Sequence, residues 1–280
     1  MEYVDTSRLV VRPLNKSVAA AFVQQHHYTH RPSSCRYALG LYYLDENDHV
    51  FFEGQHETLI GCMTYGHPVS NRTVASITKT IPVELDAVLE LTRLVILSDA
   101  KYGKNTESWF IGQSFHWLRT HAPEVKILIS YADPEQEHTG TIYRATNWYY
   151  QGCGASKIMP DYSIKLFEDS DWIHSRTVAE KFGNKNIESL AKRIGHTFWR
   201  KEETSKHRYL YFLCDKKEKK QLISDLKIPI LPYSGIQSYE QLIQKVHVKD
   251  GVIERVEVLQ GQDYGWANKQ GEIIHGKEKI

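Results

Sequence analysis

Two charged residues stand in a stretch that is otherwise apolar. Glu90 and Arg93 lie within LELTRLVIL, residues 89–97, which has the composition of a buried strand. A charge in a buried strand costs free energy unless a partner or a ligand compensates it. One interpretation is an ion pair between Glu90 and a basic neighbour. The other makes Glu90 a base or positioning group and Arg93 a clamp for an anion.

The loop after this strand could bind phosphate. Residues 98–105, SDAKYGKN, place a glycine and two lysines directly before an amphipathic helix predicted over 106–120. The first N–H groups of a helix lack intrahelical acceptors and carry partial positive charge, so they attract anions. An ordinary helix start explains the same residues without a ligand. The candidate residues for binding a cofactor phosphate are Ser98, Lys101, Gly103, Lys104, Asn105 and Ser108.

Titratable and aromatic side chains gather after a second apolar strand, residues 125–131. Tyr131 and Asp133 lie at its end, and Tyr143 lies in a short aromatic helix predicted over 141–149. A carboxylate or phenol here could exchange a proton with a reacting amine, and aromatic rings could hold a base flipped out of a duplex. Alternatively, the aromatic residues of the short helix belong to the hydrophobic core.

Three histidines lie in the loop HHYTHRPSSC that follows the first predicted helix. Imidazoles titrate near neutral pH, so His26, His27 and His30 could supply a base or ligands for a transition metal, with Cys35 and His67 as additional ligands. Their spacing is not diagnostic of a metal, and histidines at a helix end are often solvated or capping. We predict His27 as a catalytic residue and all three histidines as candidate ligands.

Basic residues concentrate between residues 175 and 220. Residues 175–195 predict two short helices around a turn, and this helix–turn–helix character with dense positive charge is typical of contact with DNA phosphates. Acidic residues are interspersed, so a solvated surface is the alternative. The candidate DNA-binding residues are Arg176, Lys192, Arg193, Arg200, Lys206 and Arg208.

The order of the elements predicts a mixed α/β sheet with helices on both faces. Strands are expected at residues 7–13, 37–44, 58–65, 89–97, 125–131 and 208–213, and helices at 17–26, 106–120 and 141–149. Residues 71–82 are expected to form a polar loop or short ribbon, and 154–169 a hairpin. Towards the end we expect a short helix over 239–248 and small strands between 251 and 276.

Composition sets broader limits. The chain has 280 residues, 41% hydrophobic, and a net charge of only +1, so nucleic-acid binding would need a local patch. Four widely spaced cysteines, no signal sequence and no membrane-spanning apolar run favour a reduced cytoplasmic protein. The expected parts are a catalytic core over 1–170, a basic helical segment with the last core strands over 171–235, and a small appendage over 236–280.

Five blocks of sequence together resemble the Mom family of phage DNA-modification proteins. They are RPLN with AFVQQHHYTHRPSSC, then GHPVS, LELTRLVI, KNTESWFIGQSFHWLR and KILISYAD, in this order between residues 12 and 152. The later stretches YADPEQEHTGTIYRATNW, KHRYLYFL and LPY resemble longer Mom-like proteins of tailed phages. Members of the family are GNAT-like in fold and convert adenine to N6-carbamoylmethyladenine, which protects phage DNA from restriction.

The resemblance implies a GNAT-like acyltransferase core, double-stranded DNA as substrate, and an acyl-CoA or related activated acyl donor; the family also suggests iron. The loop at residues 98–105, when it is aligned on Gly103, is similar to the pyrophosphate-binding turn of GNAT acyltransferases. However, Ala100 and Asn105 depart from the Q/R-x-x-G-x-G/A pattern, which puts ordinary CoA use in doubt. The pocket residues that the resemblance implies are His26, His27, Glu90, Arg93, Ser108, Tyr131, Asp133 and Tyr143.

The reaction that we expect modifies N6 of an adenine flipped out of the duplex, because N6 is otherwise engaged in base pairing. Arg93 and the loop 98–108 would hold the donor. Glu90, Asp133 or a histidine would assist proton removal, and Tyr131 or Tyr143 would stack on the base or donate a proton. Two alternatives stay open: an N-acetyltransferase for a protein or small amine, and a non-catalytic DNA-binding or inhibitor protein with the same fold.

Overall fold

The computed structural model describes residues 5–44, 57–98, 102–134, 138–153, 161–203, 206–233, 242–260, 266–267 and 273–274. The chain divides into two compact units. The first comprises Met1–Ala132, Gly140–Gly152 and His207–Ile236, and the second comprises Asp133–Thr139, Cys153–Lys206 and Gln237–Ile280. These boundaries differ from the expected parts, because the strands after residue 242 pair within the second unit instead of forming a separate appendage.

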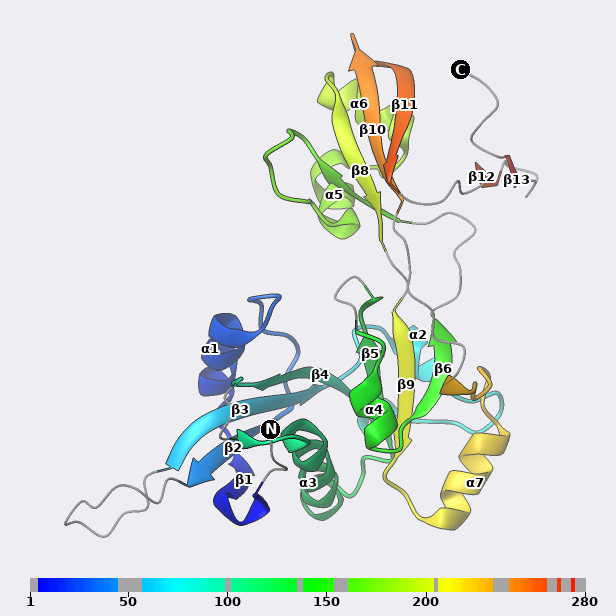
Figure 1. The fold of residues 1–280 in the computed structure, drawn as a ribbon. Helices are drawn as coiled ribbons and strands as arrows, with labels where there is room; N and C mark the ends of the chain where they lie inside the picture. The colour runs from blue at the N-terminus through cyan, green and yellow to red at the C-terminus, as the bar shows by residue number, and fades with distance from the viewer. Residues whose placement is uncertain are drawn as a thin grey trace, which may run out of the picture. The chain divides into compact units, whose positions relative to one another are not determined.

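A seven-stranded sheet, in the order β1-β2-β3-β4-β5-β9-β6, forms the centre of the first unit (Figure 1). Only β4 and β5 are parallel among the pairs β1–β2, β2–β3, β3–β4, β4–β5 and β5–β9. The predicted mixed α/β class is therefore confirmed. The strands are β1 Leu9–Pro13, β2 Tyr37–Leu44, β3 Glu57–Gly66, β4 Val88–Ile96, β5 Ile127–Ala132, β6 Tyr149–Cys153 and β9 His207–Phe212.

Helices cover both faces of this sheet, and α1 and α3 lie on opposite sides of β2–β4 in Figure 1. Alternating side chains explain the two layers, since Leu39 and Leu41 of β2 pack with α3 whereas Ala38 packs with α1. The face of α3 (Thr106–His121) also carries α4 (Thr141–Ala145); the other face carries α1 (Lys16–His26), α2 (Asn71–Ala75) and α7 (Lys216–Ser224). Short 3-10 turns occupy Thr6–Arg8 and Leu85–Ala87.

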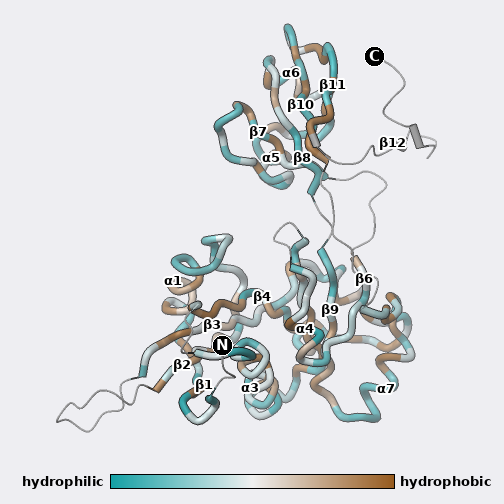
Figure 2. The backbone as a smooth tube through the Cα atoms, in the orientation of Figure 1, coloured by the Kyte–Doolittle hydropathy of each residue, from teal (hydrophilic) through white to brown (hydrophobic). Residues whose placement is uncertain are grey.

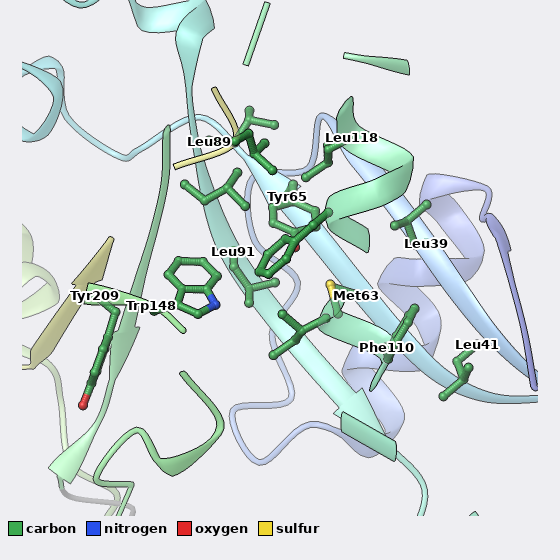
Figure 3. Close-up of a cluster of buried hydrophobic side chains, with 14 of the residues drawn as sticks. Leu39, Leu41, Met63, Tyr65, Leu89, Leu91, Phe110, Leu118, Trp148 and Tyr209 are labelled. Carbon is green, nitrogen blue, oxygen red and sulfur yellow. The ribbon is translucent and has the colours of Figure 1, made fainter. Parts of the chain in front are cut away.

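The larger core lies under α3 and is rich in aromatic rings (Figure 3). Tyr65 and Trp148 are almost fully buried within it. Trp148 therefore belongs to the hydrophobic core, which was one of the two interpretations of the aromatic residues at 141–149. The hydroxyl of Tyr65 lies 2.7 Å from Ser114 Oγ, which satisfies both groups away from water. Hydrophobic positions of β3 appear in brown in Figure 2, consistent with a strand buried on both faces.

The second unit contains an antiparallel sheet in the order β11-β10-β8-β7. Helices α5 (Ser175–Phe182) and α6 (Ile187–Ile194) pack on one face of it. Asn186 caps α6 by accepting the N–H groups of Glu188 and Ser189. The strands are β7 Tyr162–Lys165, β8 Phe198–Glu202, β10 Ile243–Lys249 and β11 Val252–Gln260, and a separate pair is formed by β12 Trp266–Ala267 and β13 Ile273–Ile274.

Several predicted elements are wrong. Residues 71–75 form the helix α2, and the aromatic helix ends at Ala145, so that Tyr149 begins β6. Of the hairpin expected over 154–169, residues 154–160 lie outside the described residues, and β7 within the remainder belongs to the sheet of the second unit. Residues 243–249 are strand β10, since their alternation of buried and half-buried side chains matches pairing with two neighbouring strands. In the described residues, no helix is long and apolar enough to cross a membrane.

Gly140 provides a test of the packing above β9. Its φ is 76°, and a Cβ at this position would overlap the phenol ring of Tyr209, which is fully buried. We expect Gly140→Ala to lower the free energy of unfolding by about 2–4 kcal/mol, from a left-handed backbone and from overpacking. Gly195 is the matched control, because its φ is 75° but its Cβ would meet nothing within 4 Å. Equal losses for both variants in denaturant unfolding would contradict the packing.

Candidate functional site

The two parallel strands part at their carboxyl ends. β4 and β5 pair only through Val88–Glu90 and Ile127–Ile129, although β4 continues to Ile96 and β5 to Ala132. At the next position Ser130 Oγ lies 3.2 Å from the carbonyl oxygen of Leu91, so a side chain makes the last link between the strands. Ligands of α/β sheets commonly bind where strands end in this way.

A β-bulge at Thr92 determines where the charges of β4 point. Tyr65 of β3 pairs with Leu91, and Thr64 pairs with Arg93, so Thr92 is the extra residue. In a regular strand, positions 90 and 93 would face opposite sides, whereas the bulge brings Glu90 and Arg93 to the face that carries α1. Thr92 Oγ1 lies 3.1 Å from the carbonyl oxygen of Thr64, which fixes the bulge.

Arg93 ties the loop after α1 to the end of β4. Its Nε donates to the carbonyl oxygen of Arg31 at 3.2 Å, and its Nη1 donates to the carbonyl oxygen of Thr92 at 2.6 Å. Burial lowers the pKa of the guanidinium, while Tyr28 and Glu90 raise it. Arg93, Glu90 and Tyr28 therefore act on one another electrostatically.

Tyr143 reaches the same opening from α4. Its hydroxyl lies 2.7 Å from Ser130 Oγ. Burial raises the pKa of Tyr143 to about 12; the hydrogen bond with Ser130 opposes the shift, and Tyr28 and Glu90 add to it. Tyr143 is consequently a neutral hydrogen-bond donor at physiological pH and not a base.

Tyr131 lies in β5 directly opposite Arg208 of β9. Burial raises the pKa of Tyr131, the guanidinium of Arg208 lowers it, Glu90 raises it, and a hydrogen bond with Thr73 lowers it. Tyr131 thus interacts both with the carboxylate at the opening and with a cation on the next strand. It is neutral near pH 7 for the same reason as Tyr143.

Glu90 acts electrostatically on three other predicted catalytic residues around this opening, Arg93, Tyr131 and Tyr143. The fifth, His27, stacks on Tyr28 with ring centroids 4.2 Å apart, which places it in the adjoining loop. The sixth, Asp133, groups with the second unit, where its carboxylate pairs with Lys206 Nζ at 3.0 Å.

Sequence reasoning missed Ser130 and Tyr28. Ser130 is 1% exposed and is the one strongly polar residue in the strand ILISYA, so its position in a buried strand was an available signal. Tyr28 carried no such signal, because it stands in a polar loop and is 46% exposed. The electrostatic interaction of Tyr28 with Arg93 becomes visible only in the structure, where the loop packs against β4.

The histidines of this loop are not grouped with other ligand-type side chains as a metal site in the described residues. His27 Nδ1 accepts the N–H of Thr29 at 3.1 Å, and His30 Nδ1 lies 2.9 Å from the carbonyl oxygen of Gln24. His26 packs its ring against Phe22 with centroids 4.7 Å apart. Within the described ranges, no three His, Cys, Asp or Glu side chains are grouped as metal ligands.

The start of α3 fits phosphate through its main chain. Gly103 and Asn105 have φ values of 76° and 69°, and Asn105 makes no side-chain cap, so the first N–H groups of a long helix are available to an anion. Lys104 is exposed beside them. Ser108 Oγ instead donates to the carbonyl oxygen of Asn105 at 2.9 Å. Of the other predicted residues, Ser98 is exposed and Lys101 lies outside the described residues.

The predicted DNA-binding residues separate into two groups. Arg176, Lys192, Arg193 and Lys206 are exposed in the second unit. Arg200 and Arg208 are only 5% and 8% exposed, so they do not belong to an exposed phosphate-binding surface. The Nε of Arg200 donates to Gln244 Oε1 at 2.5 Å, and its guanidinium lies 4.3 Å from the ring centroid of Tyr162.

Fold and site together define an α/β protein with a polar opening between two parallel strands. The sequence profile of the Mom protein family matches residues 8–235, and the chain belongs to this family. A search of curated proteins found no match.

Several solved acetyltransferase structures are similar to this chain. They include Arabidopsis thaliana NAA60 in complex with acetyl-CoA, at 11% identity and a TM-score of 0.40 over 73% of this chain and 99% of that chain. Vibrio cholerae spermidine/spermine N-acetyltransferase SpeG, in complex with manganese ions, has 10% identity and a TM-score of 0.38 over 77% and 98%. Vibrio fischeri ribosomal-protein-S5-alanine acetyltransferase has 10% identity and a TM-score of 0.39 over 74% and 94%. Similarity at this level does not define the activity of this chain.

The raised pKa of Tyr143 predicts a loss of stability in alkali. Between pH 10 and 12 the unfolded phenol releases its proton while the folded phenol keeps it, so stability falls as pH rises. We expect Tyr143→Phe to lose less stability than the wild type between pH 9 and 11, by roughly 1 kcal/mol. Urea unfolding at both pH values measures this difference. Equal losses of unfolding free energy in the two proteins would show that burial does not raise the pKa of Tyr143.

Proposed function

We propose that this protein transfers an acyl-derived, carbamoylmethyl-type group to N6 of adenine in double-stranded DNA, as an anti-restriction modification of bacteriophage DNA. Membership of the Mom family over residues 8–235 supports the substrate and the adduct. The observation that carries the proposal is the electrostatic coupling of Glu90 to Arg93, Tyr131 and Tyr143 where β4 and β5 stop pairing. The alternatives are an N-acetyltransferase for a protein or small amine and a non-catalytic DNA-binding protein, and the family match favours DNA modification over both.

The opening suits reaction at an amine of low nucleophilicity. The N6 lone pair of adenine is conjugated with the ring, so holding donor and acceptor in contact must supply much of the rate. In this proposal Glu90 removes the N6 proton, and Arg93 keeps a positive charge beside it. Tyr143, a neutral donor linked to Ser130, hydrogen-bonds the developing negative charge on the donor.

The adenine would enter as a flipped base. Tyr28 is 46% exposed, stacks on His27 and interacts electrostatically with Arg93, so it offers an aromatic face beside the opening. Tyr131 offers a second ring on β5. Stacking on such rings offsets part of the cost of unstacking the base.

The donor would be an acyl-CoA or a related activated acyl compound. When bound, it would supply an electrophilic carbonyl carbon, to which N6 forms a bond as the thiolate or an equivalent group leaves. A glycyl group transferred in this way has the same composition as a carbamoylmethyl group. The main-chain N–H groups after Asn105 and the side chain of Lys104 would hold its phosphates. The described histidines are not grouped as ligands of one metal ion, and no step is assigned to a metal.

Nucleoside mass spectrometry of DNA from expressing cells tests the proposal. Wild-type protein should add one carbamoylmethyl group to deoxyadenosine. Glu90→Gln should lower the modified fraction at least about 100-fold, because it removes the general base. Glu254→Gln, at an exposed position of β11, is the control that should retain modification. If soluble wild-type protein leaves every deoxyadenosine at its unmodified mass, the proposed reaction is wrong.

Duplex binding is proposed for the helices of the second unit, through exposed Arg176, Lys192 and Arg193. The matched control is a set of three lysines on the sheet of the same unit: Lys165 and Lys201 lie over Trp172, and Lys245 lies over Trp199. Their ammonium groups are therefore already engaged with rings.

Replacing the three helix residues by glutamine should weaken duplex binding and reduce the slope of log K against log salt by about one per lost phosphate contact. The three lysine-to-glutamine changes on the sheet should have a smaller effect in the same fluorescence-anisotropy titration. A larger effect of the sheet variant would move the binding surface from the helices to the sheet.

A further inference from the structure

Arg208 is a buried cation with one edge of its guanidinium unused by the protein. Its side chain is among the buried residues at 8% exposure, and Nη1 donates to Ser76 Oγ at 2.9 Å. Nε and Nη2 are both buried, and neither has a hydrogen-bond partner among the residues that the structure describes. Buried N–H groups of a charged side chain are costly when unsatisfied, so this edge calls for a partner.

The two unsatisfied atoms form one of the two-pronged edges of the guanidinium. The Nε–H and one Nη2–H point in the same direction, in the spacing that matches the two oxygens of a carboxylate or phosphate. Nη1, on the other side, is already used by Ser76. The unused donors are therefore arranged for one bidentate oxyanion and not scattered over several directions.

Among the residues that the structure describes, none supplies an anion to this edge. Burial lowers the pKa of Arg208, and the group that raises it is Tyr131, with no carboxylate contributing. Tyr131 is itself neutral near pH 7, since burial raises its pKa. An ion pair within the protein thus does not account for the buried charge.

Helix α2 holds the guanidinium in place. Ser76 Oγ donates to the carbonyl oxygen of Thr73 at 2.7 Å and so presents a lone pair to Arg208. Lys227 fixes the end of the helix from the α7 side, because its Nζ donates to the carbonyl oxygen of Ala75 at 2.6 Å. The charged edge is positioned before any ligand arrives, which reduces the entropy lost on binding.

We propose that Arg208, with the Tyr131 hydroxyl beside it, forms a binding subsite for the carboxylate group of a small molecule. A carboxylate carries one negative charge and matches the single cation, whereas a doubly charged phosphate would require further positive groups in a buried position. The subsite adjoins the opening, because Tyr131 also interacts with Glu90. In the proposed reaction the carboxylate would belong to the donor of the transferred group. This assignment to the donor rests on the proposed function, whereas the binding of a carboxylate at Arg208 does not depend on it.

Arginine side-chain NMR on the full chain tests the subsite without turnover. The Nε–Hε signal of Arg208 is assigned by its loss in Arg208→Lys. Titration with sodium acetate against sodium chloride at constant ionic strength should shift this signal saturably. The Nε–Hε signal of Arg200 should stay in place, because that buried Nε already donates to Gln244.

Two variants separate charge from geometry. Arg208→Lys keeps the charge but loses the two-pronged edge, so acetate affinity measured by isothermal titration calorimetry should fall at least 10-fold. Arg208→Met should melt no lower than the wild type in the absence of acetate, since it removes an uncompensated buried charge. It should also lose the acetate-dependent rise in melting temperature.

Inorganic phosphate is the competing probe. Saturable shifts of Arg208 with phosphate but not with acetate would overturn the carboxylate assignment, and equal shifts of Arg208 and Arg200 with acetate would overturn the subsite. If acetate binds as expected while DNA from expressing cells stays unmodified, the subsite stands and the proposed function fails.

Discussion

The hydrogen bond between Ser130 and the carbonyl oxygen of Leu91 marks the point where β4 and β5 stop pairing. Two parallel strands that continue side by side leave no room between them for a ligand. Here the backbone ladder ends after Glu90, and a hydroxyl takes the place of the next backbone donor. The same hydroxyl contacts Tyr143, so the parting of the strands and the placement of the phenol depend on one side chain.

The bulge at Thr92 acts on the other edge of the opening. It adds one residue to β4, and this changes the side to which every later side chain of the strand points. Arg93 consequently lies on the same face of the sheet as Glu90. From there it donates a hydrogen bond to the carbonyl oxygen of Arg31 and so holds the loop after α1. Because two donors of Arg93 are bonded to main-chain carbonyl oxygens, this side chain serves to position the loop rather than to bind an anion. Arg208, whose second edge has no hydrogen-bond partner in the described part of the chain, has the donors that an anion needs.

The parts of the fold that were predictable have strong apolar periodicity. The strand expected at 37–44 has those limits in the structure, and the helix expected at 106–120 ends one residue later. Helices α2 and α7 were missed because their polar residues conceal a single buried position each, Val74 and Leu222. Charge alone suggested that Arg208 is a surface residue. Its burial depends on α2 covering β9, a contact between segments more than a hundred residues apart.

Sequence periodicity likewise could not predict that Glu90 and Arg93 lie on the same face of the sheet, because positions 90 and 93 of a regular strand point to opposite faces. Their charge in an apolar strand was the usable signal, and the structure connects both to the opening. For Tyr131 and Tyr143 the residue type suggested proton transfer, but their ionisation behaviour follows from burial, which no local pattern reveals.

The chain returns to the first sheet only after most of the second unit. β9 lies between β5 and β6 in the sheet but follows β6 in sequence by more than fifty residues. During synthesis, β5 and β6 therefore emerge from the ribosome without the strand that joins them. At about 5–20 residues per second, several seconds pass before β9 can be inserted. Arg208 arrives with that strand, so a nascent chain holding Glu90, Arg93 and Tyr131 still lacks its oxyanion-binding cation. Because of this strand order, the opening is completed only late in translation.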